Sequence, residues 1–219
     1  MYAYFILALT FLFIWVILFY KRRDLRKEML IQSFAIWIFA FYDYFSQPGY
    51  WKPETWLSVP IGIEGFLFAF GFSGTAAVLY EELFRFHLKK IREKPNVHTL
   101  HWFVVGLVVI FSVSGPLFFG QNIMTTLLPS LFIGSFLIVL LRRDLLPQIL
   151  FSSVFFGVIY ASILFVWLTI FPDARSWWNP SFLGEYLTSI PLGEIVFGFG
   201  FGAFWGPIYE FLFGYKLIH

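Results

Sequence analysis

Two glutamates that stand a few residues after a proline are the first candidates for chemistry. Glu194 follows Pro191 by three residues and Glu64 follows Pro60 by four, and a long apolar segment begins at each. Proline suits the first turn of a helix, so both carboxyls are expected near a helix N-terminus. A carboxyl with so little water around it can act as a proton donor. The simpler alternative is an acid that only stabilises the positive end of a helix.

Three further acids lie near the ends of apolar segments. Asp43 closes the segment "FAFYDYF" and is expected at the same level as Glu64 and Glu194. Glu81 and Glu210 lie roughly 25 Å further along the same two helices, at 1.5 Å per residue. We expect this second pair to be exposed boundary acids at the opposite rim. Because intramembrane carboxylates are costly and usually face an interior cavity, the first three are the candidates for function.

The composition is that of a polytopic membrane protein. Hydrophobic residues make up 59% of the chain and charged residues 13%, and the mean hydropathy is +0.78. A soluble domain carries about a quarter charged residues. The net charge of +2 does not suggest a nucleic-acid partner. The chain has no cysteine, which excludes disulfides and thiolate metal sites.

Seven apolar stretches are long enough to cross a bilayer, which takes about 20 residues. They lie near 2–20, 28–45, 60–84, 101–119, 123–141, 148–171 and 190–214. Of the 15 Lys and Arg residues, 13 fall after the first, third, fifth and seventh stretches, and Lys52 and Arg175 are the exceptions. The positive-inside rule then predicts an outer N-terminus and a cytoplasmic C-terminus.

The chain also contains an internal repeat. "RRDLRKEML" (22–30) matches "RRDLLPQIL" (142–150), and "FAFGFSGTAAVLYE" (68–81) matches "FGFGFGAFWGPIYE" (197–210). The predicted fold is all-α, with two parallel three-helix repeats and a connector helix. Their bounds are 1–95, 96–121 for the connector, and 122–219.

Aromatic residues are abundant, with 32 Phe, 11 Tyr and 9 Trp. Most of them suit lipid-facing helices and membrane interfaces, but aromatic faces also attract cations. Each predicted outer loop contains a Trp-x-Pro sequence, beginning at Trp51 and at Trp178. We expect these two tryptophans, with Phe68 and Phe197 beside the helix-initial acids, to contact a substrate.

Taken in order, these features resemble the lycopene cyclase domain family, small membrane carotenoid cyclases that occur as paired three-span subunits or as one fused chain. The resemblance rests on the N-terminal "MYAYFILAL", the basic first inner loop, the Asp that closes the second span, the Trp-x-Pro loop, and the Pro-Glu helix that ends in Tyr-Glu. The family's Pro-x-Glu-Glu motif is represented here by Pro191 to Glu194, in which Gly193 replaces the first Glu.

The resemblance implies redox-neutral cyclisation of a linear carotenoid or related isoprenoid taken from the bilayer. Glu194 would be the acid, with Glu64 or Asp43 as its partner, and no cofactor would be needed. No metal site is expected, since His98 and His101 stand at i, i+3 without an acid to complete a zinc set.

Two alternatives from other classes stay open. One is a non-catalytic membrane protein that binds an isoprenoid or acts as a scaffold. The other is a proton-coupled transporter that uses the three acids as a relay. Association into a homo-oligomer is not decided by the sequence.

Overall fold

The computed structural model of the chain describes residues 2–37, 50–56, 62–91, 95–179, 186–187 and 189–219, and these residues are predominantly helical. The helices are α1 (Ala3–Lys21), α2 (Arg26–Trp37), α4 (Ile63–Phe84), α5 (Pro95–Phe119), α6 (Met124–Leu141), α7 (Leu146–Ile170), α8 (Leu192–Trp205) and α9 (Ile208–Phe213). Two short 3-10 helices, η2 (Arg143–Leu145) and η3 (Pro172–Trp177), flank α7.

Six of the described helical segments are long and apolar enough to cross a membrane. They are α1, α4, α5, α6, α7 with the preceding η2, and α8 with α9. The predicted second span, 28–45, begins in α2, but residues 38–49 lie outside the described part of the chain, and Asp43 with them. The predicted count of seven spans is therefore neither supported nor contradicted.

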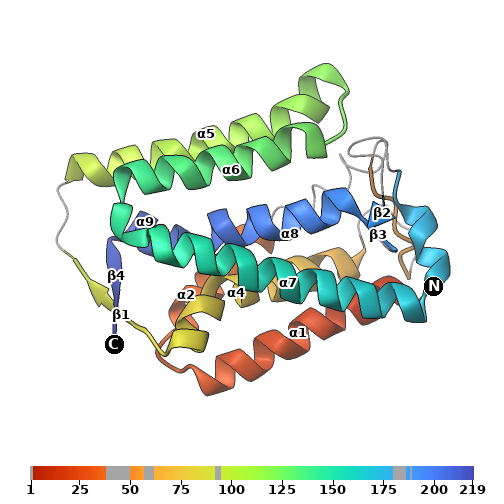
Figure 1. Ribbon diagram of the computed structural model, residues 1–219, viewed down its shortest axis with the longest axis horizontal. Helices are drawn as coiled ribbons and strands as arrows, with labels where there is room; N and C mark the ends of the chain where they lie inside the picture. The colour runs from red at the N-terminus through yellow and green to blue at the C-terminus, as the bar shows by residue number, and fades with distance from the viewer. Residues whose placement is uncertain (1, 38–49, 57–61, 92–94, 180–185, 188) are drawn as a thin grey trace.

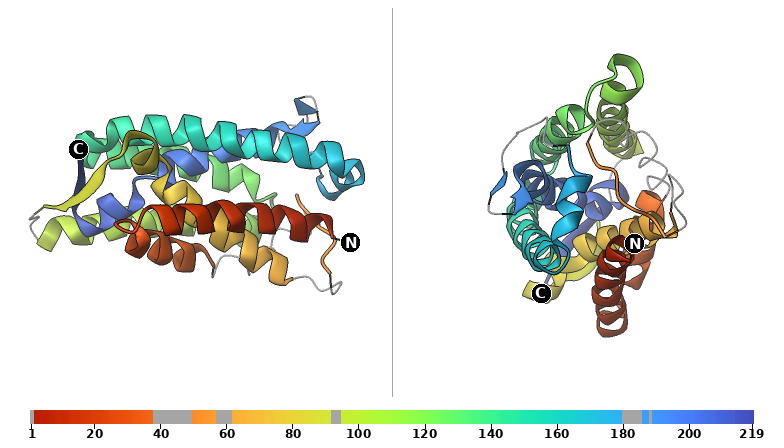
Figure 2. Two further views of the ribbon diagram at one scale, coloured as in Figure 1. Left: turned by 90° about the horizontal axis from the view of Figure 1, so that it is seen from below. Right: turned by 90° about the vertical axis from the view of Figure 1, so that its right-hand side faces the viewer.

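The central helices are α4 and the α8–α9 segment, and both are mostly buried inside the protein. α1 and α2 pack against α4, whereas α6 and α7 pack against α8, and α5 lies along α6 (Figure 1). The end-on view shows α5 at one edge of the bundle and α1 at the other (Figure 2). Large apolar side chains cover the outside; Phe13 on α1 is 66% exposed and Phe118 on α5 is 75% exposed. Such a surface suits contact with lipid, and it would be unusual on a protein that is surrounded by water.

The last membrane-length helix is broken where Pro207 follows Gly206. Proline has no backbone N–H and its ring clashes with the preceding turn, so a helix bends or stops there. α9 then ends at Gly214, whose φ of 65° is a left-handed conformation that glycine adopts without strain.

Short antiparallel strand pairs, which the all-α prediction did not include, form near the two ends of the bundle. At one end β1 (His87–Lys90) pairs with β4 (Tyr215–Ile218), so the segment after α4 is joined to the C-terminus. At the other end β2 (Tyr186–Leu187) pairs with β3 (Ile190–Pro191), just before α8. The N- and C-termini lie at opposite ends of the molecule (Figure 1).

The two Trp-x-Pro loops lie side by side at the end that carries β2 and β3. The backbone N–H of Lys52 donates to the carbonyl of Trp177 (2.8 Å), and that of Asn179 donates to the carbonyl of Tyr50 (2.7 Å). Trp51 and Trp178 face each other across this isolated bridge. These contacts fix the position of both tryptophans above the bundle.

At the opposite end, Arg22 holds the turn after α4. Its guanidinium donates to the backbone carbonyls of Glu81 (2.6 Å) and Phe86 (2.5 Å) and pairs with Asp24 (2.8 Å). The hydrogen bond from Arg22 lowers the pKa of the Asp24 carboxyl to about 2.

Arg142 makes the corresponding contacts in the second half of the chain. It donates to the carbonyls of Glu210 (3.4 Å) and Tyr215 (2.8 Å), and it pairs with Asp144 (2.8 Å). The ends of α4 and α9 are therefore held by the same kind of arginine contact.

The expectation that Glu81 and Glu210 are exposed was wrong. Both side chains are 0% exposed. The sequence places them near the ends of their helices, but the arginine-held turns and the β1–β4 pair close this end of the bundle over them.

Candidate functional site

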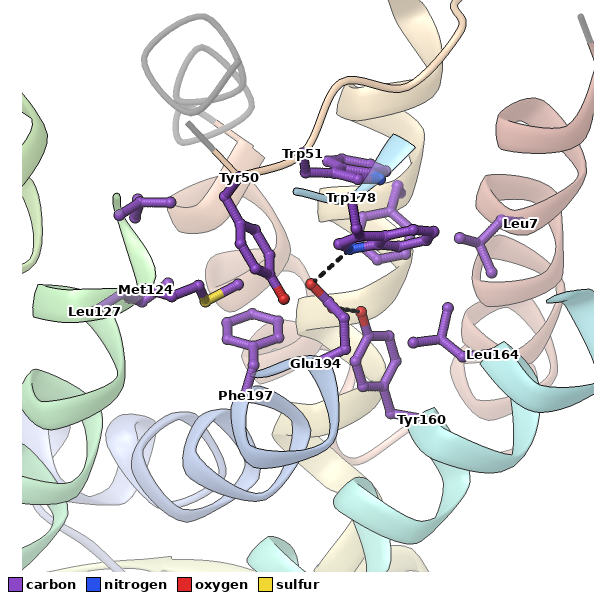
Figure 3. A pocket seen from close by; sticks show the side chains of 12 residues that line it. Leu7, Tyr50, Trp51, Met124, Leu127, Tyr160, Leu164, Trp178, Glu194 and Phe197 are labelled. Carbon is purple, nitrogen blue, oxygen red and sulfur yellow. Dashed lines mark hydrogen bonds between the residues drawn. The ribbon is translucent and has the colours of Figure 1, made fainter. Parts of the chain in front are cut away.

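A cavity of about 120 Å³ lies beneath the paired Trp-x-Pro loops. α1, α4, α6, α7 and α8 each contribute side chains to it, so both halves of the chain form its walls. Apolar residues make up most of the lining: Leu7, Phe68, Ile123, Met124, Leu127, Leu164 and Phe197. The polar groups come from Tyr50, Trp51, Tyr160, Trp178 and Glu194 (Figure 3). An engineered cavity of about 150 Å³ binds benzene, so this one matches a small apolar group or the end of a longer molecule.

Glu194 is the only carboxyl group among the described residues that line this cavity. It lies in the first turn of α8 and is 6% exposed. The indole N–H of Trp178 donates to its Oε1 (3.0 Å), and the hydroxyl of Tyr160 donates to its Oε2 (Figure 3). Each carboxyl oxygen thus has a donor from a different element, which fixes the orientation of the group.

Tyr50 approaches the same carboxyl from the other side of the cavity (Figure 3). Its hydroxyl lies against Gly193, where an added Cβ would come within 2.8 Å of the hydroxyl oxygen. Gly193 is the position at which the Pro-x-Glu-Glu pattern has its first Glu. In this chain the Tyr50 hydroxyl occupies the space next to Glu194, and a residue larger than glycine at position 193 would displace that hydroxyl.

Aromatic rings form the roof and one side of the cavity. Trp51 and Trp178 form the roof with ring centroids 6.0 Å apart, and Tyr4 meets Trp51 edge-on at 4.9 Å. Phe197 meets the ring of Tyr160 nearly edge-on at 6.1 Å. Rings in these positions exclude water and offer their negative faces to a positive charge.

A second cavity of about 160 Å³ adjoins the first between α5, α6 and α8. Leu127 and Phe197 line both cavities, so their side chains form the partition between them. The other residues of the second cavity are apolar except for Ser112, and they include Val109 and Phe201. Two largely apolar cavities thus lie next to each other, and Glu194 faces the first.

The structure brings together five of the seven residues that the sequence suggested. Trp51, Phe68, Trp178, Glu194 and Phe197 line the first cavity.

Glu64 is buried, at 1% exposure, but it is not among the lining residues. Its Oε1 accepts the backbone N–H of Trp56 (2.6 Å), which ties Trp56 to the first turn of α4. Asp43 lies outside the described residues.

Sequence reasoning missed Tyr50 and Tyr160. Tyr160 lies in the middle of an apolar helix, where a buried hydroxyl needs a hydrogen-bond partner. That requirement was a usable signal, although the partner could not be identified without the fold.

One of the comparisons with known proteins found a match, and it covers part of this site. Residues 121–212 match the family model for lycopene cyclase. No curated protein and no solved structure matches the chain. The matched residues include α6, α7 and α8, and with them Tyr160, Trp178 and Glu194. In this second half, the chain is similar to the lycopene cyclase family.

Proposed function

We propose that the protein is an integral-membrane cyclase that closes a ring at the end of a linear carotenoid of the lycopene type. One observation carries the proposal: a single buried carboxyl, that of Glu194 in the family-matched residues, faces a small aromatic-walled cavity. Such a site suits proton transfer to a hydrocarbon, because there is little water to compete for the proton or to trap a cation.

The reaction is redox-neutral. Glu194 gives its proton to the terminal alkene of the carotenoid, which becomes a tertiary cation. The neighbouring alkene attacks this cation and closes a six-membered ring. The positive charge then lies on a carbon of the ring. Loss of a proton from a carbon next to that charge restores a double bond. The proton gained and the proton lost balance, so the product is an isomer of the substrate and no redox cofactor is required.

Tyr160 and Trp178 act as positioning residues for Glu194. When the carboxyl gives up its proton, both oxygens of the carboxylate already have donors. Hydrogen bonds to a charged group are stronger than those to a neutral one, so these donors favour the ionised product of the transfer. The preorganised donors therefore lower the barrier to protonation. The same carboxylate is then placed to accept a proton from the cyclised cation.

The second cavity suits the polyene that follows the reacting end group. It adjoins the first cavity across Leu127 and Phe197, and its lining is almost entirely apolar. We place the end group beside Glu194 and the first part of the conjugated chain between α5, α6 and α8. The rest of the molecule would extend into the bilayer.

We further propose the membrane arrangement inferred from the sequence: two parallel three-helix repeats, a connector formed by α5, and an outer N-terminus. The matching contacts of Arg22 and Arg142 support the repeat. The site then lies near the outer surface, and the basic residues of the β1–β4 end face the cytoplasm.

The test is expression in bacteria that accumulate lycopene, followed by separation of the extracted pigments. The wild-type chain is expected to produce monocyclic or bicyclic carotene, and Glu194→Gln is expected to produce none. Glu54→Gln, which changes an exposed acid near the same end of the bundle, is the matched control and should retain activity. Glu64→Gln tests whether the second acid suggested by the sequence takes part.

Unchanged lycopene, with the wild-type protein present in the membrane, would reject lycopene as the substrate. Copurification of unaltered pigment with that protein would favour the non-catalytic isoprenoid-binding alternative. Rings formed equally by the wild type and Glu194→Gln would reject the assigned acid.

A further inference from the structure

Three glutamates form a second buried cluster at the opposite end of the bundle. Glu28 comes from α2, Glu81 from α4 and Glu210 from α9, and we call these residues the inner acid cluster. One oxygen of each carboxyl lies within 4.8 Å of the others, and all three side chains are 0% exposed. None of them takes part in the proposed cyclisation.

The hydrogen bonds of the two nearby arginines go to the backbone beside the inner acid cluster. Arg22 pairs with Asp24 and donates to the backbone carbonyl of Glu81, not to its carboxyl group. Arg142 similarly donates to the backbone carbonyl of Glu210. Buried carboxylates at this spacing repel one another strongly, so the charge must be removed by protons or balanced by a bound cation.

Two buried glutamine side chains add amide oxygens to the cluster. Gln32 Nε2 donates to Glu28 Oε1 (3.2 Å), and Gln148 Nε2 donates to Glu81 Oε1 (2.6 Å). These bonds place both amide groups against the carboxyls, and the two glutamines are 2% and 1% exposed. Among the described residues, no hydrogen-bond partner reaches Glu28 Oε2, Glu81 Oε2, Gln32 Oε1, Gln148 Oε1 or either carboxyl oxygen of Glu210.

We propose that the inner acid cluster binds one divalent cation of the hard, oxygen-preferring class to which Mg²⁺ and Mn²⁺ belong. The donors are carboxylate and amide oxygens, with no sulfur or imidazole, and this set favours such ions over zinc or copper. The unpartnered oxygens supply the ligands and the carboxylates supply the charge. This site differs from the sequence-based expectation of no metal site, because its acids are brought together only by the fold.

A further cavity adjoins the inner acid cluster. A cavity of about 220 Å³ at the same end is lined by Gln148, Asp144, Lys216 and Tyr80. Gln148 thus contacts the inner acid cluster on one side and this cavity on the other. We therefore place the entry of the cation past Asp144 and Gln148.

A bound cation would join the two halves of the chain. Glu28 and Glu81 come from the first half, and Gln148 and Glu210 come from the second. The ion would therefore stabilise the packing of the central helices independently of the cyclase reaction. Failure of one proposal leaves the other unaffected.

The test uses the full chain purified in detergent or nanodiscs, treated with EDTA and then titrated with Mn²⁺. Electron paramagnetic resonance counts bound Mn²⁺, and the unfolding temperature is measured in parallel. We expect one Mn²⁺ per chain and a rise in unfolding temperature on binding. Glu210→Gln keeps the shape of the side chain and removes one charge. A change to a residue that only contacts the ligands typically weakens metal binding by roughly 10- to 100-fold. Because Glu210 is itself a ligand, Glu210→Gln should weaken Mn²⁺ binding by more than that.

Glu82→Gln is the matched control, since Glu82 is adjacent to Glu81 but pairs with Lys21 and Arg22 outside the cluster. It should bind Mn²⁺ like the wild type. The proposal is refuted if the folded wild-type protein binds no Mn²⁺ and its unfolding temperature is unchanged by Mn²⁺, Mg²⁺ or EDTA. Infrared spectroscopy gives a second test, in which the band of a protonated carboxyl that disappears in Glu210→Gln is assigned to Glu210. The proposal is equally refuted if this band persists in the wild-type protein at saturating Mn²⁺.

Discussion

Replacing Tyr160 with phenylalanine is expected to slow cyclisation while leaving the cavity intact. Tyr160 is buried and its hydroxyl donates to Glu194 Oε2. Phenylalanine keeps the ring that packs against Phe197 and removes only the donor. A hydrogen bond to a charged group contributes about 1.5–3 kcal/mol. At about 1.4 kcal/mol per tenfold change in rate, the loss slows protonation by roughly 10- to 150-fold.

The assay is the initial rate of ring formation by purified protein in proteoliposomes that contain lycopene. Tyr209→Phe is the control, because it removes the hydroxyl of a buried tyrosine that lies in α9, away from the cavity, and it should leave the rate unchanged. A Tyr160→Phe rate within about twofold of wild type would refute the role assigned to this hydroxyl. Trp178→Phe removes the other donor and should show a loss of similar size.

Three further predictions concern other parts of the structure. Gly193→Ala places a Cβ within 2.8 Å of the Tyr50 hydroxyl, so we expect destabilisation of about 1–3 kcal/mol in thermal unfolding and reduced activity. Val109→Trp fills the second cavity, and it should raise the KM for lycopene more than it lowers kcat. The pKa of Asp24 in the folded protein is about 2, against an ordinary value of 3.8. The stabilising pair with Arg22 is therefore present above pH 3.8 and is lost as the pH falls toward 2. The difference in unfolding temperature between wild type and Asp24→Asn should therefore shrink over that range.

Each of these predictions has a control and a contrary result. An added Cβ at Gly106 meets nothing within 4 Å, so Gly106→Ala should not reduce activity; equal losses in both alanine variants would contradict the tyrosine contact. Leu107→Trp, on an exposed position of the same helix as Val109, should leave the KM unchanged. A constant Asp24→Asn difference down to pH 2 would show that the pair with Arg22 does not stabilise the fold.

Much of the helical fold could be predicted from hydropathy. The predicted spans 2–20, 60–84, 123–141 and 148–171 correspond closely to α1, α4, α6 and α7, because an apolar run of that length has few alternatives to a membrane helix. The break between α8 and α9 was marked by Pro207 but was not predicted, since proline is tolerated in many membrane helices. The short strand pairs had no clear sequence signal.

The candidate site was only partly predictable. Pro191 and the apolar run behind it singled out Glu194, and the repeated Trp-x-Pro sequences singled out Trp51 and Trp178. Local sequence could not reveal that Tyr160, from another helix, donates to the same carboxyl. Such a contact depends on how α7 packs against α8.

Glu81 and Glu210 show the limit of reasoning from depth along a helix. Their distance from the helix start correctly places them near the far end of the bundle. Their burial depends on α2, which contributes Glu28, and on turns that are held from other parts of the chain by Arg22 and Arg142. Position along one helix does not give exposure when several segments close over its end.

The most direct test of the central claim is cyclisation in D₂O. Protein equilibrated in D₂O and supplied with lycopene should yield rings that each carry one deuterium in the first turnover, because the ring-initiating proton comes from the exchangeable carboxyl of Glu194. Glu194→Gln should form no ring under the same conditions. Unlabelled rings from the wild type, or labelled rings from Glu194→Gln, would contradict the assignment of Glu194 as the acid.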